Sequence, residues 1–131
     1  MSPIRLERLE TAIRTVLDFN EALNRHDVSA MMRLMSEDCI YESPGPAPEG
    51  TVFKGKASIT QFWQEHFSQS PTAHYQIEDV FSFGERCILH GKYSGADTAG
   101  REQIIRRVDV FRVRSGLICE QLAYVKGLHP E

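Results

Sequence analysis

The chain has 131 residues, of which 41% are hydrophobic and 25% charged, proportions typical of one globular domain spanning residues 1–131 and not of collagen-like, disordered or coiled-coil chains. Fifteen basic and eighteen acidic residues give a net charge of −3, with no long run of like charge. A nucleic-acid surface needs a basic stripe and a membrane-surface helix needs a basic face, so neither partner is expected.

The first part of the chain carries helical patterns. Apolar residues three and four positions apart predict a long amphipathic helix over residues 4–25. Asp27 is a typical N-cap residue and predicts a second, short helix whose buried face carries methionines. Residues 36–38 are expected to close that helix, before a short β-prone run at residues 39–41.

A proline-rich segment at residues 42–50 predicts a surface loop inside the domain, because proline is excluded from helix interiors and central strands. Residues 50–57 nearly spell a phosphate-binding loop, but Ala57 stands where that loop needs a hydroxyl, so a turn leading into a helix is expected. The spacing of apolar residues from 59 to 67 predicts this third helix, which ends before Pro71.

From Tyr75 onward the hydrophobic pattern has a period of two, and glycines punctuate it. Strands are predicted over residues 75–83, 86–94, 102–114 and 117–126. Helices followed by an antiparallel meander give an α+β domain, with three N-terminal helices packed on the concave side of a cone-shaped, curved antiparallel sheet. Such a sheet wrapped round a long helix encloses a cone, whose open mouth would admit a ligand.

The cellular location and the need for a cofactor are predicted from the charges near the N-terminus, the length of the apolar runs and the spacing of cysteines and histidines. The charged N-terminus, with Arg5 and Glu7, lacks the apolar core of a signal peptide, and no stretch approaches the roughly 18 apolar residues of a membrane span. The odd number and wide spacing of Cys39, Cys87 and Cys119 suit reduced thiols, so a cytoplasmic protein is expected. No histidine or cysteine spacing is typical of a metal site and no dinucleotide motif occurs, so no cofactor is expected.

The strand at residues 102–114 carries most of the chemical information. Alternation places Arg107 and Asp109 on one face, beside apolar side chains. A charged pair on an apolar face costs free energy unless the two ions satisfy each other or a ligand. Either the pair is an ordinary surface ion pair, or Asp109 lies in the wall of an apolar cavity, which is the interpretation we favour. The proximity of Arg107 then favours a carboxylate over a neutral acid.

The opposite face of the same strand carries Val108 and Val110 between Arg106 and Arg112. An apolar centre with a charged rim is typical of a self-complementary twofold interface. We therefore expect a homodimer formed through the sheet.

Several segments follow one another in a familiar order. They are residues 22–27 (ALNRHD), 31–39 (MMRLMSEDC), the Glu-Ser-Pro loop at 42–44, 53–59 (FKGKASI), the pair 62–63 (FW) and 109–118 (DVFRVRSGLI). Their order and spacing resemble the SnoaL-like and ketosteroid-isomerase-like branch of the nuclear transport factor 2 superfamily over nearly the whole chain. The resemblance implies a cone-shaped α+β fold, usually dimeric through the convex face of the sheet. Because this fold hosts isomerases, cyclases, hydrolases, dehydratases and non-catalytic binders, it implies no single reaction.

The resemblance also assigns positions to the ketosteroid isomerase site, which uses an aspartate base and an oxyanion hole of a tyrosine and a protonated aspartic acid. Asp109 matches the hydrogen-bond-donating acid. Ser43 falls at the position of the base, with Glu42 one residue earlier, and Phe19 falls at the position of the tyrosine. Trp63 falls where the family often places a pocket aromatic. Since two of the three chemical groups are replaced, steroid isomerisation by that mechanism is not expected.

Two other branches of the superfamily offer partial matches. Limonene epoxide hydrolases use Asp-Arg-Asp around an activated water, and the run from Arg107 to Asp109 resembles their Arg-x-Asp. Ala123 stands where the other aspartate would be, which argues against epoxide hydrolysis. SnoaL-like cyclases use an acid/base carboxylate or histidine in an apolar cavity without a cofactor, a role that Asp109 with His90 would fill.

Together these observations predict a protein with a pocket for a hydrophobic small molecule. The preferred function is a cofactor-free acid/base enzyme of isomerase, cyclase or hydrolase type, with Asp109 titrating and Arg107 either orienting it or holding an anion. His90 and Glu42 are the second-rank partners. The alternative is a non-catalytic module for binding a hydrophobic ligand or for dimerisation. The predicted ligand-binding residues are Phe19, Tyr41, Ser43, Trp63, Phe111 and Tyr124.

Overall fold

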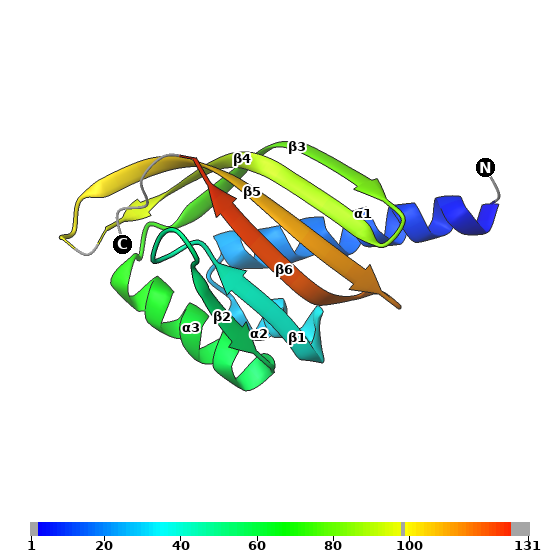
Figure 1. Cartoon of the computed structure of the whole chain (residues 1–131), viewed down its shortest axis with the longest axis horizontal. Coiled ribbons are helices and arrows are strands. Elements are labelled where there is room, and N and C mark those ends of the chain that lie inside the picture. Colours follow the sequence, from blue (N-terminus) through cyan, green and yellow to red (C-terminus); the bar gives the residue numbers. More distant parts are fainter. Residues whose placement is uncertain (1–2, 98, 127–131) are drawn as a thin grey trace.

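The computed structural model describes residues 3–97 and 99–126, without the side chains of residues 3–10. The elements follow one another as α1 (Pro3–Asn24), α2 (Val28–Arg33), β1 (Met35–Ser43), β2 (Thr51–Lys54), α3 (Lys56–Gln69), β3 (His74–Phe83), β4 (Arg86–Ala96), β5 (Glu102–Arg114) and β6 (Leu117–Val125). Figure 1 shows α1 lying along the sheet, with its N-terminal end extending past the strands. None of the described helices is both long and apolar enough to cross a membrane.

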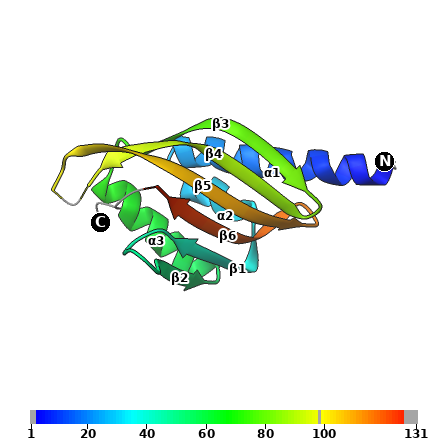
Figure 2. The same ribbon diagram turned by 45° about the horizontal axis from the view of Figure 1, so that its top comes forward.

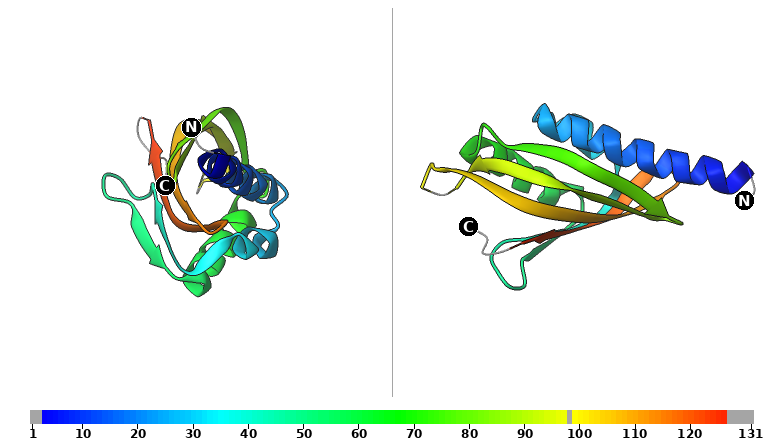
Figure 3. Two further views of the ribbon diagram at one scale, coloured as in Figure 1. Left: turned by 90° about the vertical axis from the view of Figure 1, so that its right-hand side faces the viewer. Right: turned by 90° about the horizontal axis from the view of Figure 1, so that it is seen from above.

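The strands form one sheet in the order β2-β1-β6-β5-β4-β3. The sheet curves around the helices, which lie on its concave side (Figures 2 and 3), so the predicted cone-like α+β fold is confirmed. One detail is corrected: the sheet is mixed, because β1 and β6 pair in parallel. Tight hairpins force neighbours along the chain to be antiparallel, whereas β1 and β6 are joined through most of the domain and are free of that constraint.

Helix α1 supplies much of the core on the concave side. Its side chains Val16, Phe19 and Leu23, spaced by three and four residues, are almost completely buried. Asn24 ties the end of α1 to the edge strand β3. Its side-chain amide donates to the Tyr75 carbonyl at 3.0 Å, and its side-chain oxygen accepts from the Tyr75 N–H at 2.8 Å. These bonds satisfy backbone groups that an edge strand would otherwise leave open.

The region between α1 and α3 differs most from the prediction. Residues 36–38, expected to close α2, belong to β1 instead. The cause lies in β6, where Ile118 donates its backbone N–H to the Leu34 carbonyl at 2.8 Å and pairs with Met35. Strand pairing therefore overrides the local helical pattern. The expected turn before α3 contains β2, a short edge strand that pairs antiparallel with the end of β1.

Replacement of Asp27 with alanine is expected to lower the free energy of unfolding by about 0.5–2 kcal/mol. The Asp27 carboxylate caps α2 by accepting a hydrogen bond from the Ala30 N–H at 3.0 Å, as its residue type predicts. Urea unfolding followed by circular dichroism measures the loss. Asp27→Asn keeps an acceptor in the same place and serves as the matched control. An equal loss in both variants would show that the cap is not responsible.

The cysteines act as packing residues in this fold. Cys39 and Cys87 are buried, and burial raises the pKa of the Cys39 thiol to about 12 and that of Cys87 to about 11. Burial also raises the pKa of Cys119, which is partly exposed. Because the thiolate is the reactive form, none of the three is poised as a nucleophile at neutral pH.

Candidate functional site

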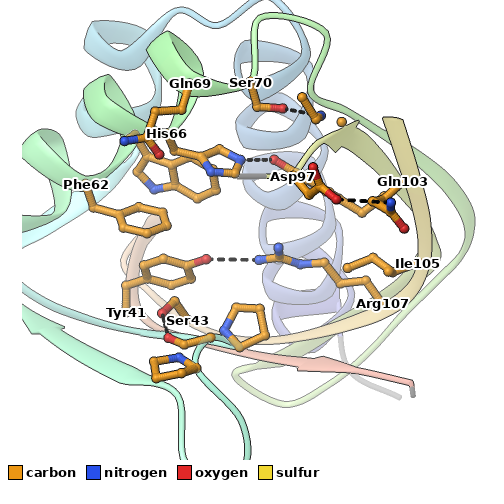
Figure 4. Close-up of a pocket in the computed structure, with 17 residues that line it drawn as sticks. Tyr41, Ser43, Phe62, His66, Gln69, Ser70, Asp97, Gln103, Ile105 and Arg107 are labelled. Carbon is orange, nitrogen blue, oxygen red and sulfur yellow. Dashed lines mark hydrogen bonds between the residues drawn. The ribbon is translucent and has the colours of Figure 1, made fainter. Parts of the chain in front are cut away.

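A cavity of about 280 Å³ lies between α3 and the inner face of β1, β4 and β5, with the proline-rich segment at residues 44–46 along its rim. Figure 4 shows side chains from these elements pointing into one space. The volume lies at the lower end of the range for small-molecule sites. The cavity therefore suits a small ligand.

Aromatic side chains form one wall of this cavity. Phe62, Trp63 and His66 share one face of α3, because residues three and four positions apart on a helix lie on the same side. Tyr41 from β1 stacks on Trp63 with ring centroids 5.5 Å apart and meets Phe62 edge-on at 5.3 Å. This wall gives an apolar ligand a flat surface to contact.

The opposite wall holds a buried ion pair. Arg107 is 5% exposed and Asp109 is 1% exposed, and the alternation of β5 points both inward as predicted. Arg107 Nε donates to Asp109 Oδ1 at 2.8 Å, and Arg107 Nη2 donates to Asp109 Oδ2 at 3.1 Å. Gln121 Nε2 donates to the same Oδ2 at 2.9 Å. Three donors on one carboxyl group are the arrangement of an ionised acceptor.

Only one partner of this ion pair lines the cavity, and it is Arg107. Its Nη2 also donates to the Tyr41 hydroxyl at 3.1 Å (Figure 4). Its Cζ atom lies 5.0 Å from the centre of the Tyr93 ring, within cation–π range. Burial lowers the pKa of Arg107, but Asp109 and Tyr41 raise it more, so the pKa is well above its ordinary value. Asp109 thus stands behind a permanent cation and holds it in place.

Two hydrogen-bond donors in the cavity wall have no acceptor within residues 3–97 and 99–126. One is Arg107 Nη1, since the bonds of Arg107 use only Nε and Nη2. The other is Trp63 Nε1, which is buried without a partner. Arg107 Nη1 belongs to a side chain that lines the cavity, so an oxygen atom of a ligand or a water molecule can accept its hydrogen bond, whereas Trp63 Nε1 is buried away from solvent.

A second polar pair lies in the same cavity. The His66 Nε2 atom is 2.6 Å from the Tyr93 hydroxyl. Burial raises the pKa of Tyr93, although Arg107 opposes the rise, so the phenol is neutral at physiological pH. Sequence reasoning did not assign either residue to the site. The sequence nevertheless carried a signal for each residue. His66 follows Trp63 by three positions and so lies on the same face of the helix. Tyr93 lies two positions after Gly91 on the inward face of β4, and Gly91 is the residue that pairs with Arg107.

The predicted site residues divide into three groups. Tyr41, Ser43, Trp63 and Arg107 line the cavity. Phe19 and Phe111 are buried elsewhere in the core, where their rings meet edge-on at 5.8 Å. Asp109 lies behind Arg107 rather than in the cavity wall.

The third group lies on the outer face of the sheet. Glu42 pairs across the sheet with Leu122, and His90 and Tyr124 both flank Val108. These positions alternate with the inward ones, so strand geometry turns the three side chains away from the cavity and from Asp109. Tyr124 is 52% exposed. The cavity roles predicted for Glu42, His90 and Tyr124 therefore have no geometric basis.

The residue opposite Asp109 bears on the hydrolase resemblance. Ala123 of β6 pairs directly with Asp109 and is buried, so a methyl group occupies the place where the resemblance requires a second carboxylate. Among the described residues, no group of three or more histidine, cysteine, aspartate or glutamate side chains is arranged to hold a metal ion.

Comparison with known proteins agrees with this architecture. An NTF2-like protein of unknown function from Mesorhizobium loti is 30% identical, with a TM-score of 0.75 over 92% of this chain and 94% of that one. An LEH-like epoxide hydrolase from M. tuberculosis is 18% identical, with a TM-score of 0.78 over 90% and 84% of the two chains. TerC, co-crystallised with polyporic acid, is 16% identical, with a TM-score of 0.77 over 88% and 92%. The last two show a shared fold alone.

A search of the curated proteins gives no match. The SnoaL-like domain model matches residues 16–121, which is most of the chain. The chain therefore belongs to the SnoaL-like domain family and has the NTF2-like fold.

Proposed function

We propose that the chain binds a hydrophobic small molecule in the cavity, with an oxygen atom of that molecule accepting hydrogen bonds from Arg107. The observation that carries the proposal is Arg107 Nη1, a donor on a cation that lines the cavity, for which no acceptor is found in the described part of the chain. Trp63 lines the same cavity, and its buried Nε1 has no partner among the described residues. The aromatic side chains around them supply apolar contact for the rest of the ligand.

The charge balance of the wall favours a neutral ligand oxygen over a carboxylate. Asp109 already neutralises Arg107 through two hydrogen bonds. A carboxylate arrives without a proton, so its binding would add a net negative charge to a cavity that the Asp97 carboxylate also lines. A carbonyl oxygen gains a charge-assisted hydrogen bond from Arg107 without that cost.

A cofactor-free acid/base enzyme is the second candidate function. The observation that favours it is the hydrogen-bonded pair of His66 and Tyr93, which places a titratable imidazole in a cavity with a buried cation. The fold allows both functions, since one neighbour is an LEH-like epoxide hydrolase and another was co-crystallised with polyporic acid. Ligand binding comes first in either case.

The proposal is tested with acetophenone and ethylbenzene, which have similar size and differ in one carbonyl group. A hydrogen bond to a charged group contributes about 1.5–3 kcal/mol, so acetophenone is expected to bind at least about tenfold more tightly. Calorimetry gives the affinities. Trp63 is the only tryptophan, so its indole N–H gives a single NMR signal, which should move when the carbonyl binds.

Arg107→Lys keeps the positive charge but loses the fork that reaches Asp109 and the cavity together, so the preference for acetophenone should fall below about threefold. Gln69→Ala, at the exposed rim, is the matched control and should keep the preference. Benzoate is expected to bind more weakly than acetophenone. Equal affinities for acetophenone and ethylbenzene, with an unmoved Trp63 signal, would refute the proposal.

We also propose that a second copy of the chain covers the outer face of the sheet. One cross-strand row on this face contains the apolar residues Phe81, Ile88, Val110 and Leu122 and ends in the charged Glu42 of β1. Phe81 is 50% exposed, although it is a large apolar side chain. Ion pairs flank the row, with Glu120 bonded to Arg86. An apolar centre with a charged rim supports a twofold interface, as the sequence of β5 predicts.

A further inference from the structure

The hydrogen-bonded pair of His66 and Tyr93 joins a helix and a strand at the wall of the cavity. His66 comes from α3 and Tyr93 from β4, and the 2.6 Å between Nε2 and the hydroxyl oxygen is short for a hydrogen bond. Both side chains line the cavity together with Arg107. Figure 4 shows His66 on one side of the cavity and the bonded Tyr41 and Arg107 on the other. An oxygen atom between these two sides can meet Arg107 and the pair together.

The direction of the hydrogen bond determines what the pair offers a ligand. When His66 Nε2 carries no proton, the Tyr93 hydroxyl donates to it and leaves oxygen lone pairs available to a ligand O–H. Burial raises the pKa of Tyr93, so the phenol does not keep a negative charge itself. When the Tyr93 oxygen takes up a proton from a ligand, its own hydroxyl proton therefore moves to the imidazole.

We propose that His66 and Tyr93 together accept a proton from the ligand, which is a molecule with an acidic hydroxyl group, a phenol or an enol. This inference rests on the proposed ligand-binding function and names the ligand class. The ligand O–H bond breaks and its proton binds the Tyr93 oxygen, while the Tyr93 proton moves to His66 Nε2. The products are a ligand oxyanion, a neutral Tyr93 and a His66 imidazolium. No oxidant or co-reactant is needed.

The charge balance of the cavity supports this transfer. Among the described residues, the charged side chains at the cavity before the transfer are Arg107 with its partner Asp109, and Asp97, which follows β4. Tyr41 and Tyr93 are neutral titratable groups of the wall. After the transfer, the new anion is balanced by the new imidazolium, so the net charge of the cavity is unchanged. The unpaired Arg107 Nη1 then donates to an oxyanion, which is a stronger acceptor than a neutral oxygen.

The test uses 3,5-dichlorophenol as the probe, because its anion absorbs at longer wavelength than the neutral phenol and it has no other oxygen. The absorbance of the bound probe is recorded against pH. Half-ionisation is expected at least about one pH unit below that of the free phenol, a tenfold change in the ionisation constant. At a pH where the bound probe is ionised, one histidine NMR signal should move to the imidazolium position on binding. That signal should be missing from His66→Gln.

The variants separate this pair from Arg107, which also favours an anion. His66→Gln and Tyr93→Phe both keep Arg107. In each variant, the ionisation constant of the bound probe should be at least about tenfold smaller than in the wild-type protein. His90→Gln, on the outer face, is the matched control and should behave as wild type. If the ionisation constant of the bound probe is as large in both His66→Gln and Tyr93→Phe as in the wild-type protein, the inference is overturned.

The methyl ether 3,5-dichloroanisole separates this inference from the proposed function, because it has the shape of the probe without the acidic proton. If the ether binds but the phenol binds with unchanged ionisation, or does not bind, the proton-accepting role fails and the binding function stands. If neither compound binds in the cavity, both fail. If both bind and only the phenol protonates His66, both are supported.

Discussion

Asp109→Leu is expected to lower the free energy of unfolding by about 3–5 kcal/mol, because it leaves the guanidinium of Arg107 buried without its counter-charge. The pair is almost completely buried, and Asp109 accepts two hydrogen bonds from Arg107 and one from Gln121. Arg107→Met should lower the free energy of unfolding by a similar amount, because it leaves the Asp109 carboxylate buried without a counter-ion. Urea unfolding of each variant measures the loss.

The double variant Arg107→Met/Asp109→Leu separates stability from binding. Replacing both members of a buried ion pair with apolar residues of similar volume is often neutral or stabilising by about 1–4 kcal/mol. The double variant should therefore be at least as stable as the wild type, while its preference for acetophenone over ethylbenzene disappears. If Asp109→Leu unfolds like the wild type, Asp109 does not hold Arg107 in the way we infer.

Val110→Glu is expected to convert the proposed dimer to a monomer, with an affinity between copies at least about a hundredfold weaker. Val110 lies in the apolar row on the outer face, between Ile88 and Leu122 across the sheet. A twofold interface would bury this glutamate in both copies without a partner, which costs several kcal/mol. Sedimentation of wild type and variant over a range of concentrations measures the change.

Ala57→Glu is the matched control, because it makes the same charge change at an exposed position of α3. It should leave the association constant unchanged. A wild-type chain that remains monomeric at high concentration contradicts the dimer, and an equally dimeric Val110→Glu variant places the interface on another surface.

Local sequence patterns were sufficient to predict features that depend only on the geometry of one strand or one helix end. In β5, Arg107 and Asp109 point inward while Val108 and Val110 point outward, because successive side chains of any strand alternate. The cap at Asp27 was readable for the same reason, since a capping bond spans only three residues. The family resemblance extended this reading to the α+β fold of the whole chain.

The same local reasoning failed where distant pairing competes with it. Residues 36–38 joined β1 because their neighbours pair with β6, which lies about eighty residues further along the chain. His90 and Glu42 were assigned to the site through their chemistry and the resemblance, but alternation turns both to the outer face. Their strand register was not deducible from the segments themselves.

The positions of Arg107 and Asp109 at the cavity show which features the sequence alone does not predict. That Arg107 and Asp109 share one face is a property of the strand, so the sequence alone predicts it. Which of the two reaches the cavity depends on how α1 and α3 pack over the sheet, and that packing leaves Arg107 in the wall with Asp109 behind it. The contact of His66 with Tyr93 likewise joins a helix and a strand 27 residues apart. Such positions are set by many weak long-range contacts, which no local period encodes.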